Sequence, residues 1–100
     1  MTWDDVRNQI AEWSACPWLP DAVDPISDNV LTMLSAYVVR HKHEPAPEKI
    51  EVTTDLSIVL RWPDWQVYFH DDGCVERITP RSDGGHRRQI LVQQDGEMIP

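Results

Sequence analysis

The sequence predicts an α+β fold, with two N-terminal helices packed on one face of a four- to five-stranded antiparallel meander sheet. Apolar residues recur at spacings of three and four in the first half of the chain, and they alternate with polar residues in the second half. A Pro-Ala-Pro segment at residues 45–47 separates the halves, neither of which could bury its apolar face alone. In a chain of 100 residues we therefore expect a single domain, 1–100, with a helical half 1–44 and a strand half 49–94.

The first helix is predicted over residues 3–15. Thr2 followed three residues later by Asp5 has the form of a capping box, which marks a helix start. Pro17 disfavours helical geometry at the preceding residue and ends the segment. Its apolar face consists of Trp3, Val6, Ile10 and Trp13.

The second helix is predicted to begin at Asp24-Pro25, with Asp as the N-cap and Pro at the first helical position. It should end before Pro45, where basic residues gather as the helix dipole favours. A broad apolar stripe at helical period supports this helix, formed by Ile26, Val30, Met33, Leu34, Tyr37 and Val38 and continued by His41.

A hairpin around Pro63-Asp64 dominates the strand half. Proline fixes φ near −65°, so a tight two-residue primed turn is excluded and a four-residue loop is expected. Trp62 and Trp65 would stand at the two ends of that loop. Counting outward places every large apolar residue on one face, with Leu60 opposite Val67 and Ile58 opposite Phe69.

A second turn is predicted at Asp71-Asp72-Gly73, with Gly73 available for the left-handed conformation. The register of the following strand stays open. A three-residue loop would point Val75 inward, whereas a two- or four-residue loop would point Ile78 inward. A last strand is predicted over residues 87–93.

Turn and core residues of the chain resemble a recurring pattern in small uncharacterised bacterial proteins. The likeness covers residues 18–78, although Leu56-Ser57 stands where that group has glycines and Arg61 where it has Glu. It implies a shared fold. No activity is known for that group, so the resemblance assigns no functional residue. The matching residues are Pro45-Ala46-Pro47, Ile50, Thr53-Thr54-Asp55, Ile58, Leu60, Trp62, Val67 and Asp72-Gly73.

Charge narrows the possible partners. The chain has 17 Asp and Glu against 9 Lys and Arg, a formal net charge of −8. This balance argues against a general phosphate-neutralising surface, so we expect no direct nucleic-acid binding. The acid lies mainly in residues 1–28 and 49–78. It forms either a solvated surface that keeps the protein soluble or a face for a basic protein partner.

These observations favour a small, acidic, non-enzymatic protein-binding module of the kind found among inhibitors, antitoxins, immunity proteins and adaptors. Trp18 is the least constrained of the five tryptophans and is a candidate for an exposed anchor. Arg61 and Tyr68 fall on the sheet face away from the apolar residues, and this composition is typical of recognition surfaces. We predict these three residues as the partner-binding set.

The alternative is a metal-dependent or hydrolytic enzyme that uses His41, His70 and Cys74. Imidazole and thiolate groups suit zinc, but His41 and His43 lie two residues apart and would not share a helix face. Cys74 is surrounded by no nucleophile motif. We therefore expect no catalytic residue, no bound metal and no cofactor.

Location and self-association follow from simpler features. The N-terminus lacks a basic, apolar secretory signal, and no apolar run approaches the length of a membrane span, so we expect a cytoplasmic protein without membrane contact. Two cysteines are too few for a disulfide framework. A homodimer could form through the last strand if its edge is unpaired.

Overall fold

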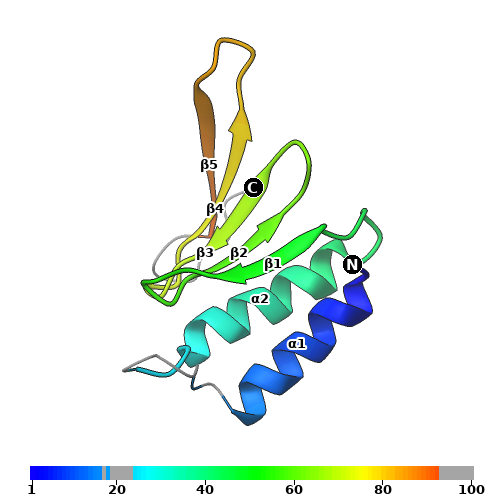
Figure 1. The fold of residues 1–100 in the computed structure, drawn as a ribbon, viewed down its shortest axis with the longest axis vertical. Coiled ribbons are helices and arrows are strands. Elements are labelled where there is room, and N and C mark those ends of the chain that lie inside the picture. The colour runs from blue at the N-terminus through cyan, green and yellow to red at the C-terminus, as the bar shows by residue number, and fades with distance from the viewer. Residues whose placement is uncertain (17, 19–23, 93–100) are drawn as a thin grey trace.

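The computed structural model describes residues 1–16, 18 and 24–92. Two helices precede a five-stranded antiparallel sheet in the strand order β1-β2-β3-β4-β5, which confirms the predicted α+β fold (Figure 1). The elements are α1 (Trp3–Ala15), α2 (Asp28–His41), β1 (Lys49–Val52), β2 (Ile58–Arg61), β3 (Gln66–Phe69), β4 (Val75–Pro80) and β5 (His86–Val92).

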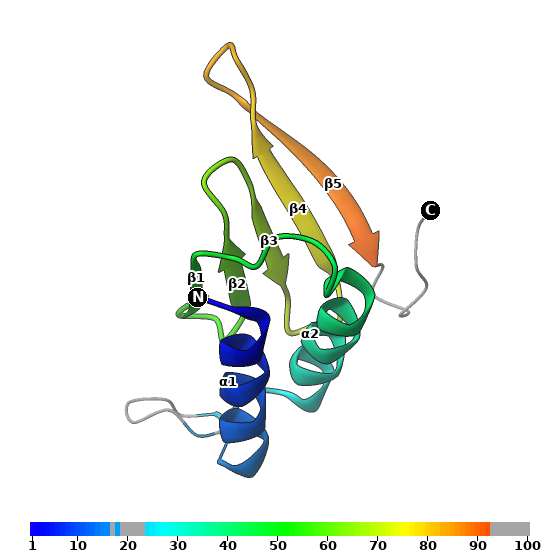
Figure 2. The same ribbon diagram turned by 90° about the vertical axis from the view of Figure 1, so that its right-hand side faces the viewer.

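The helices cover only part of the sheet. Both lie side by side against one face, near β1, β2 and β3, whereas the β4–β5 hairpin continues well beyond them (Figures 1 and 2). We call the opposite face, on which no described helix lies, the open face. In the part of the chain that the structure describes, no helix has the length and apolar character needed to cross a membrane.

The predicted start and end of α1 are confirmed. Thr2 Oγ1 accepts a hydrogen bond of 3.2 Å from the N–H group of Asp5, and Asp5 Oδ2 accepts one of 2.8 Å from the N–H group of Thr2. This reciprocal pair is a capping box. The Thr2 N–H group, followed by the Thr2 hydroxyl, holds the pKa of Asp5 below its ordinary value.

The predicted start of α2 at Asp24-Pro25 is wrong, because the helix begins at Asp28. Its N-cap is Ser27, whose hydroxyl oxygen accepts a hydrogen bond of 3.2 Å from the N–H group of the third helical residue. Ile26, directly before the cap, is buried in the same core cluster as Leu31, four residues after the cap. These positions are those of a hydrophobic staple, which fixes the direction in which the chain enters the helix.

The expected hairpin register is confirmed. Residues 62–65 form the four-residue connection between β2 and β3. The Trp62 and Trp65 rings stack across this connection with centroids 5.3 Å apart. The same-face pairs are those counted from the sequence, Leu60 with Val67 and Ile58 with Phe69.

The open question of the β4 register is settled in favour of Val75, which pairs with Phe69 and is buried. The turn before it is the three-residue alternative, closed by a hydrogen bond of 2.8 Å from the His70 N–H group to the Cys74 carbonyl oxygen. Gly73 adopts a φ of 88°, a left-handed conformation that glycine enters without steric cost. Ile78 consequently lies on the open face.

One apolar core joins the helical and strand halves. The Pro-Ala-Pro segment is tied to it, because the Trp62 indole N–H donates a hydrogen bond of 3.0 Å to the Pro45 carbonyl oxygen. The core lies between the helices and the sheet. Its members among the described residues are Val6, Ile10, Ile26, Val30, Leu31, Leu34, Val38, Ile58, Leu60, Trp62, Val67, Phe69 and Val75.

Candidate functional site

A cleft of about 630 Å³ opens between α2 and the helix-facing side of β3, β4 and β5. It exists because the β4–β5 hairpin continues where the helices stop, as Figure 2 shows, so this side of the hairpin is only partly covered. We call it the aromatic cleft, because its walls include Trp3, Tyr37, Trp62, Trp65 and Phe69.

The α2 wall of the aromatic cleft follows from helical spacing. Met33, Ala36, Tyr37 and Arg40 follow the i, i+3, i+4, i+7 spacing and therefore share one face of α2. At the end of this wall His41 stacks on Tyr37 with ring centroids 4.0 Å apart, and its Nδ1 atom pairs with the Glu44 carboxylate.

Arg77 supplies the cationic group of the cleft from β4. Its guanidinium carbon lies 4.7 Å from the centre of the Trp65 ring, a cation–π geometry. Val75, two residues earlier, faces the helices, so strand alternation places Arg77 on the same side. The sequence analysis did not single out Arg77. The three-residue loop that it left open points Val75 toward the helices, and strand alternation then points Arg77 the same way.

Tyr37 places a hydroxyl group in the aromatic cleft. Burial, followed by the negative charge of Glu44, raises the pKa of Tyr37 to about 12, while the positive charge of Arg77 opposes this shift. The hydroxyl is therefore protonated at neutral pH and can donate a hydrogen bond.

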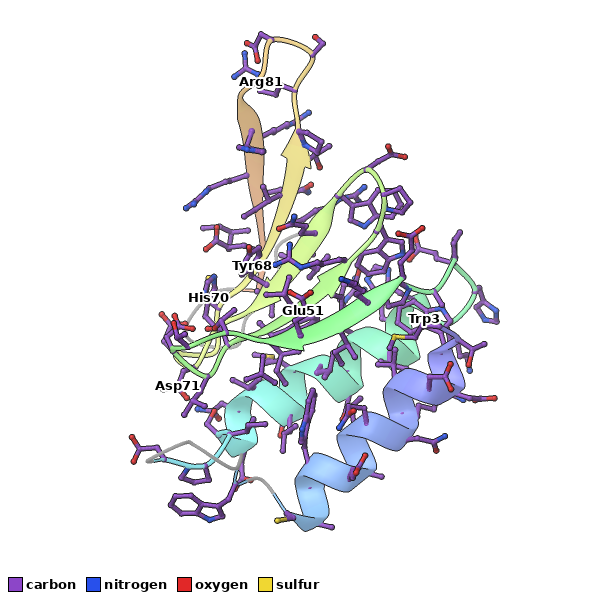
Figure 3. The ribbon with its side chains drawn as sticks, in the orientation of Figure 1. Trp3, Glu51, Tyr68, His70, Asp71 and Arg81 are labelled. Atoms are coloured by element: carbon purple, nitrogen blue, oxygen red, sulfur yellow. The ribbon has the colours of Figure 1, made fainter. Side chains whose placement is uncertain are left out.

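The open face carries two of the three predicted partner-binding residues. Arg61 and Tyr68 both border one shallow depression of about 540 Å³. Arg61 Nε donates a hydrogen bond of 2.8 Å to Glu51 Oε2, and this contact holds the pKa of Glu51 below its ordinary value. Figure 3 shows Glu51 and Tyr68 on neighbouring parts of this face.

Two cross-strand rows make up most of the open face. Val59 is fully buried despite facing away from the helices, and its partners in register are Glu51 and Tyr68. The first row is Lys49, Arg61, Gln66, Ile78 and Arg88, and the second is Glu51, Val59, Tyr68, Glu76 and Ile90.

A polar chain at the end of the open face was not anticipated. His70 Nε2 lies 2.8 Å from Glu76 Oε1, and His70 Nδ1 lies 3.5 Å from the Ser57 hydroxyl oxygen. The order serine, histidine, carboxylate is that of hydrolase triads. However, Ser57 is buried, so its hydroxyl is closed to a substrate. We interpret this series of side-chain contacts as a structural link between β3, β4 and the start of β2.

The residues of the alternative enzyme are not brought together. His41 lies on the helix side of the sheet, bound to Glu44, whereas His70 lies on the open face. Burial, followed by Asp72 and Glu76, raises the pKa of Cys74 and keeps its thiol protonated at neutral pH. Among residues 1–16, 18 and 24–92, no group of three or more His, Cys, Asp or Glu side chains could hold a metal ion.

Trp18 is 55% exposed, as expected for an anchor. It belongs to the connector between α1 and α2, which lie on the other side of the sheet, so the structure does not join it to Arg61 and Tyr68. Acidic groups are also spread apart: in Figure 3, Asp71 and the start of α1, marked by Trp3, lie on opposite sides of the lower part of the molecule.

The comparisons with known proteins assign no identity to either surface. The resemblance to small bacterial proteins stays a prediction that no finding tests. Comparison of the chain with protein-family models, curated proteins and solved structures found no match.

Proposed function

We propose that the chain is a small, acidic, non-enzymatic protein-binding module that contacts its partner through the open face. The observation that supports this most is the position of Tyr68. It stands in the middle strand of the sheet, half-buried, with Arg61 on the adjacent strand and the exposed Ile90 in its own cross-strand row. Tyrosine and arginine are enriched at the energetically dominant positions of protein interfaces.

Contacts among the charged side chains of the open face hold them in place. Glu51 binds Arg61, and Glu76 lies 2.8 Å from His70 and 3.7 Å from Arg88. Side chains already held in place lose less conformational freedom when a partner binds. The face therefore offers a pre-ordered contact surface.

The partner that we propose is a basic protein, and the charge that favours it belongs to the chain as a whole. The two rows of the open face are themselves nearly balanced, with three basic side chains against two acidic ones. A formal net charge of −8 produces a negative field that attracts positively charged proteins and speeds their encounter. An inhibitor, antitoxin, immunity protein or adaptor fits this size and charge, and we propose that the chain is one of these. Both cysteines are free thiols, which suits the reducing cytoplasm.

A second copy of the chain is a further candidate partner, favoured by one observation. β5 ends the described strand order, so its outer edge pairs with no described strand. Arg87 and Arg88 lie on this edge strand, and charged side chains weaken edge-to-edge pairing. The heterologous partner is therefore our first choice, and light scattering between 10 and 500 μM will separate the two.

Affinity capture from the native host tests the open face directly. We expect an immobilised chain to capture a partner, and we expect Tyr68→Ala, Arg61→Ala and Ile90→Asp to abolish capture. Ile90 is 45% exposed, so this change leaves the core untouched. Arg40→Ala and Trp18→Ala, on the helix side, serve as matched controls and should retain capture.

Two results would count against the open face. Full capture by folded Ile90→Asp and Arg61→Ala chains would move the interface elsewhere, and loss of capture in Trp18→Ala alone would assign it to the helix connector. Circular dichroism confirms that each variant is folded. Capture that weakens as salt is raised from 0.05 to 0.5 M would support a basic partner.

A further inference from the structure

We propose that the aromatic cleft is a binding site for a small carboxylic acid with an apolar body, such as an aryl-alkyl carboxylate. The body would lie between the aromatic walls, and the carboxylate would meet the guanidinium group of Arg77. This site lies on the other side of the sheet from the open face, so it does not depend on the proposed protein partner.

The size and lining of the cleft suit a small molecule. About 630 Å³ lies within the range of roughly 300–1,000 Å³ that is typical of ligand pockets. Such pockets combine largely apolar walls with a few converging polar groups. Here the walls are the aromatic set together with Met33 and Leu91, and the polar groups are Arg77, Tyr37 and Gln89.

Arg77 differs from three other arginines of the sheet and its turns, which are paired with carboxylates. Arg61, Arg81 and Arg88 each have a carboxylate oxygen within 4 Å. In the described part of the chain, no carboxylate lies within 4.0 Å of Arg77. A half-buried guanidinium that rests on an aromatic ring keeps its donors free for a two-pronged contact with a carboxylate.

Neighbouring groups add to this preference for an acid. Gln89 is the partner of Arg77 in register on β5 and lines the same cleft. Tyr37 keeps a protonated hydroxyl that can donate to a carboxylate. Glu44, the acidic side chain of the wall, pairs with His41 rather than with Arg77. Arg40 adds a second positive charge, so the cleft is locally cationic in an acidic protein.

A titration of the full chain with 4-phenylbutyrate and its neutral amide, 4-phenylbutanamide, tests the site. The two probes share an apolar body and differ in charge. We expect the carboxylate to shift the indole N–H signals of Trp62 and Trp65 in ¹⁵N spectra, with an affinity at least tenfold above that of the amide. Arg77→Gln should reduce carboxylate affinity to the level of the amide, and the open-face control Arg88→Gln should leave it unchanged.

Three outcomes would overturn the proposal. Equal affinity for acid and amide would show a purely apolar groove, as would unchanged carboxylate binding by Arg77→Gln. No shift of the two indole signals at millimolar carboxylate would exclude the site. The comparison of acid with amide uses the unaltered chain, so it decides the matter even if Arg77→Gln does not fold. None of these results bears on capture through the open face.

Discussion

The two faces of the same five strands use their residues in opposite ways. Toward the helices, Ile58, Phe69 and Val75 form a continuous buried row across β2, β3 and β4. On the open face, Arg61 and Tyr68 are held by ion pairs and stacking and remain partly exposed. Stability is thus concentrated on one side, which leaves the other side free to specify a partner. Each experiment below challenges this division, beginning with the largest expected effect.

Phe69→Ala should lower the free energy of unfolding more than any other change considered below. Phe69 is fully buried and meets the edge of Tyr37 at a centroid distance of 5.4 Å. Its removal leaves a cavity, so we expect the free energy of unfolding to fall by about 3–5 kcal/mol in urea denaturation. Ile90→Ala on the open face should change it by no more than about 0.5 kcal/mol. Equal losses of unfolding free energy in the two variants would show that stability is not concentrated on the helix-facing side of the sheet.

Val59→Ala probes the place where the division is least strict. Val59 faces away from the helices yet has 0% exposure. Loss of two buried methyl groups should lower the free energy of unfolding by about 2 kcal/mol. The matched control is Val39→Ala in α2, where the side chain is 67% exposed and the change should be close to neutral. A neutral Val59→Ala would mean that the open face contributes little to folding.

Tyr37 tests the burial of the aromatic cleft. In a Tyr68→Phe chain, absorbance at 295 nm should report the ionisation of Tyr37 with a pKa of about 12. Because this pKa is raised above that of the unfolded chain, about 10, the stabilising contribution is complete below pH 10. It is lost as pH rises toward 12. Titration near pH 10 would show that the cleft is open to water.

Glu51→Gln should have the smallest effect. Arg61 lowers the pKa of Glu51, so this ion pair stabilises the fold above the unfolded pKa of the carboxyl group and is lost as pH falls through the folded value. The stability difference between the original and variant chains should therefore shrink as pH falls below the ordinary value of 4.5. A difference that does not shrink with falling pH would mean that the carboxylate charge is not its cause.

Local chemistry explains which elements were predicted correctly. The start of α1 follows from a capping box within four residues, its end follows from Pro17, and the β2–β3 register follows from alternation on both sides of one turn. The start of α2 was missed because Asp24-Pro25 offers good capping chemistry. The burial of Ile26 decides instead for Ser27, and that burial depends on the tertiary fold.

The candidate sites differ in the same respect: one follows from local sequence patterns and the other depends on the tertiary fold. The shared face of Arg61 and Tyr68 follows from strand alternation and needed no structure. The aromatic cleft depends on how far the β4–β5 hairpin extends past α2, a relation between distant segments that no local pattern encodes. Arg77 became recognisable only when the register of β4 was settled by Val75.

The β4–β5 hairpin lines both hollows, one with each of its faces. Arg77 and Gln89 face the aromatic cleft, and Ile78 and Arg88 face the depression on the open face. If occupancy of the cleft changes the tilt of this hairpin, the affinity of a partner on the far side must change with it. Linkage makes such an effect reciprocal, so the partner would alter carboxylate affinity by the same factor. The two proposed sites would then be coupled through the two strands that they share.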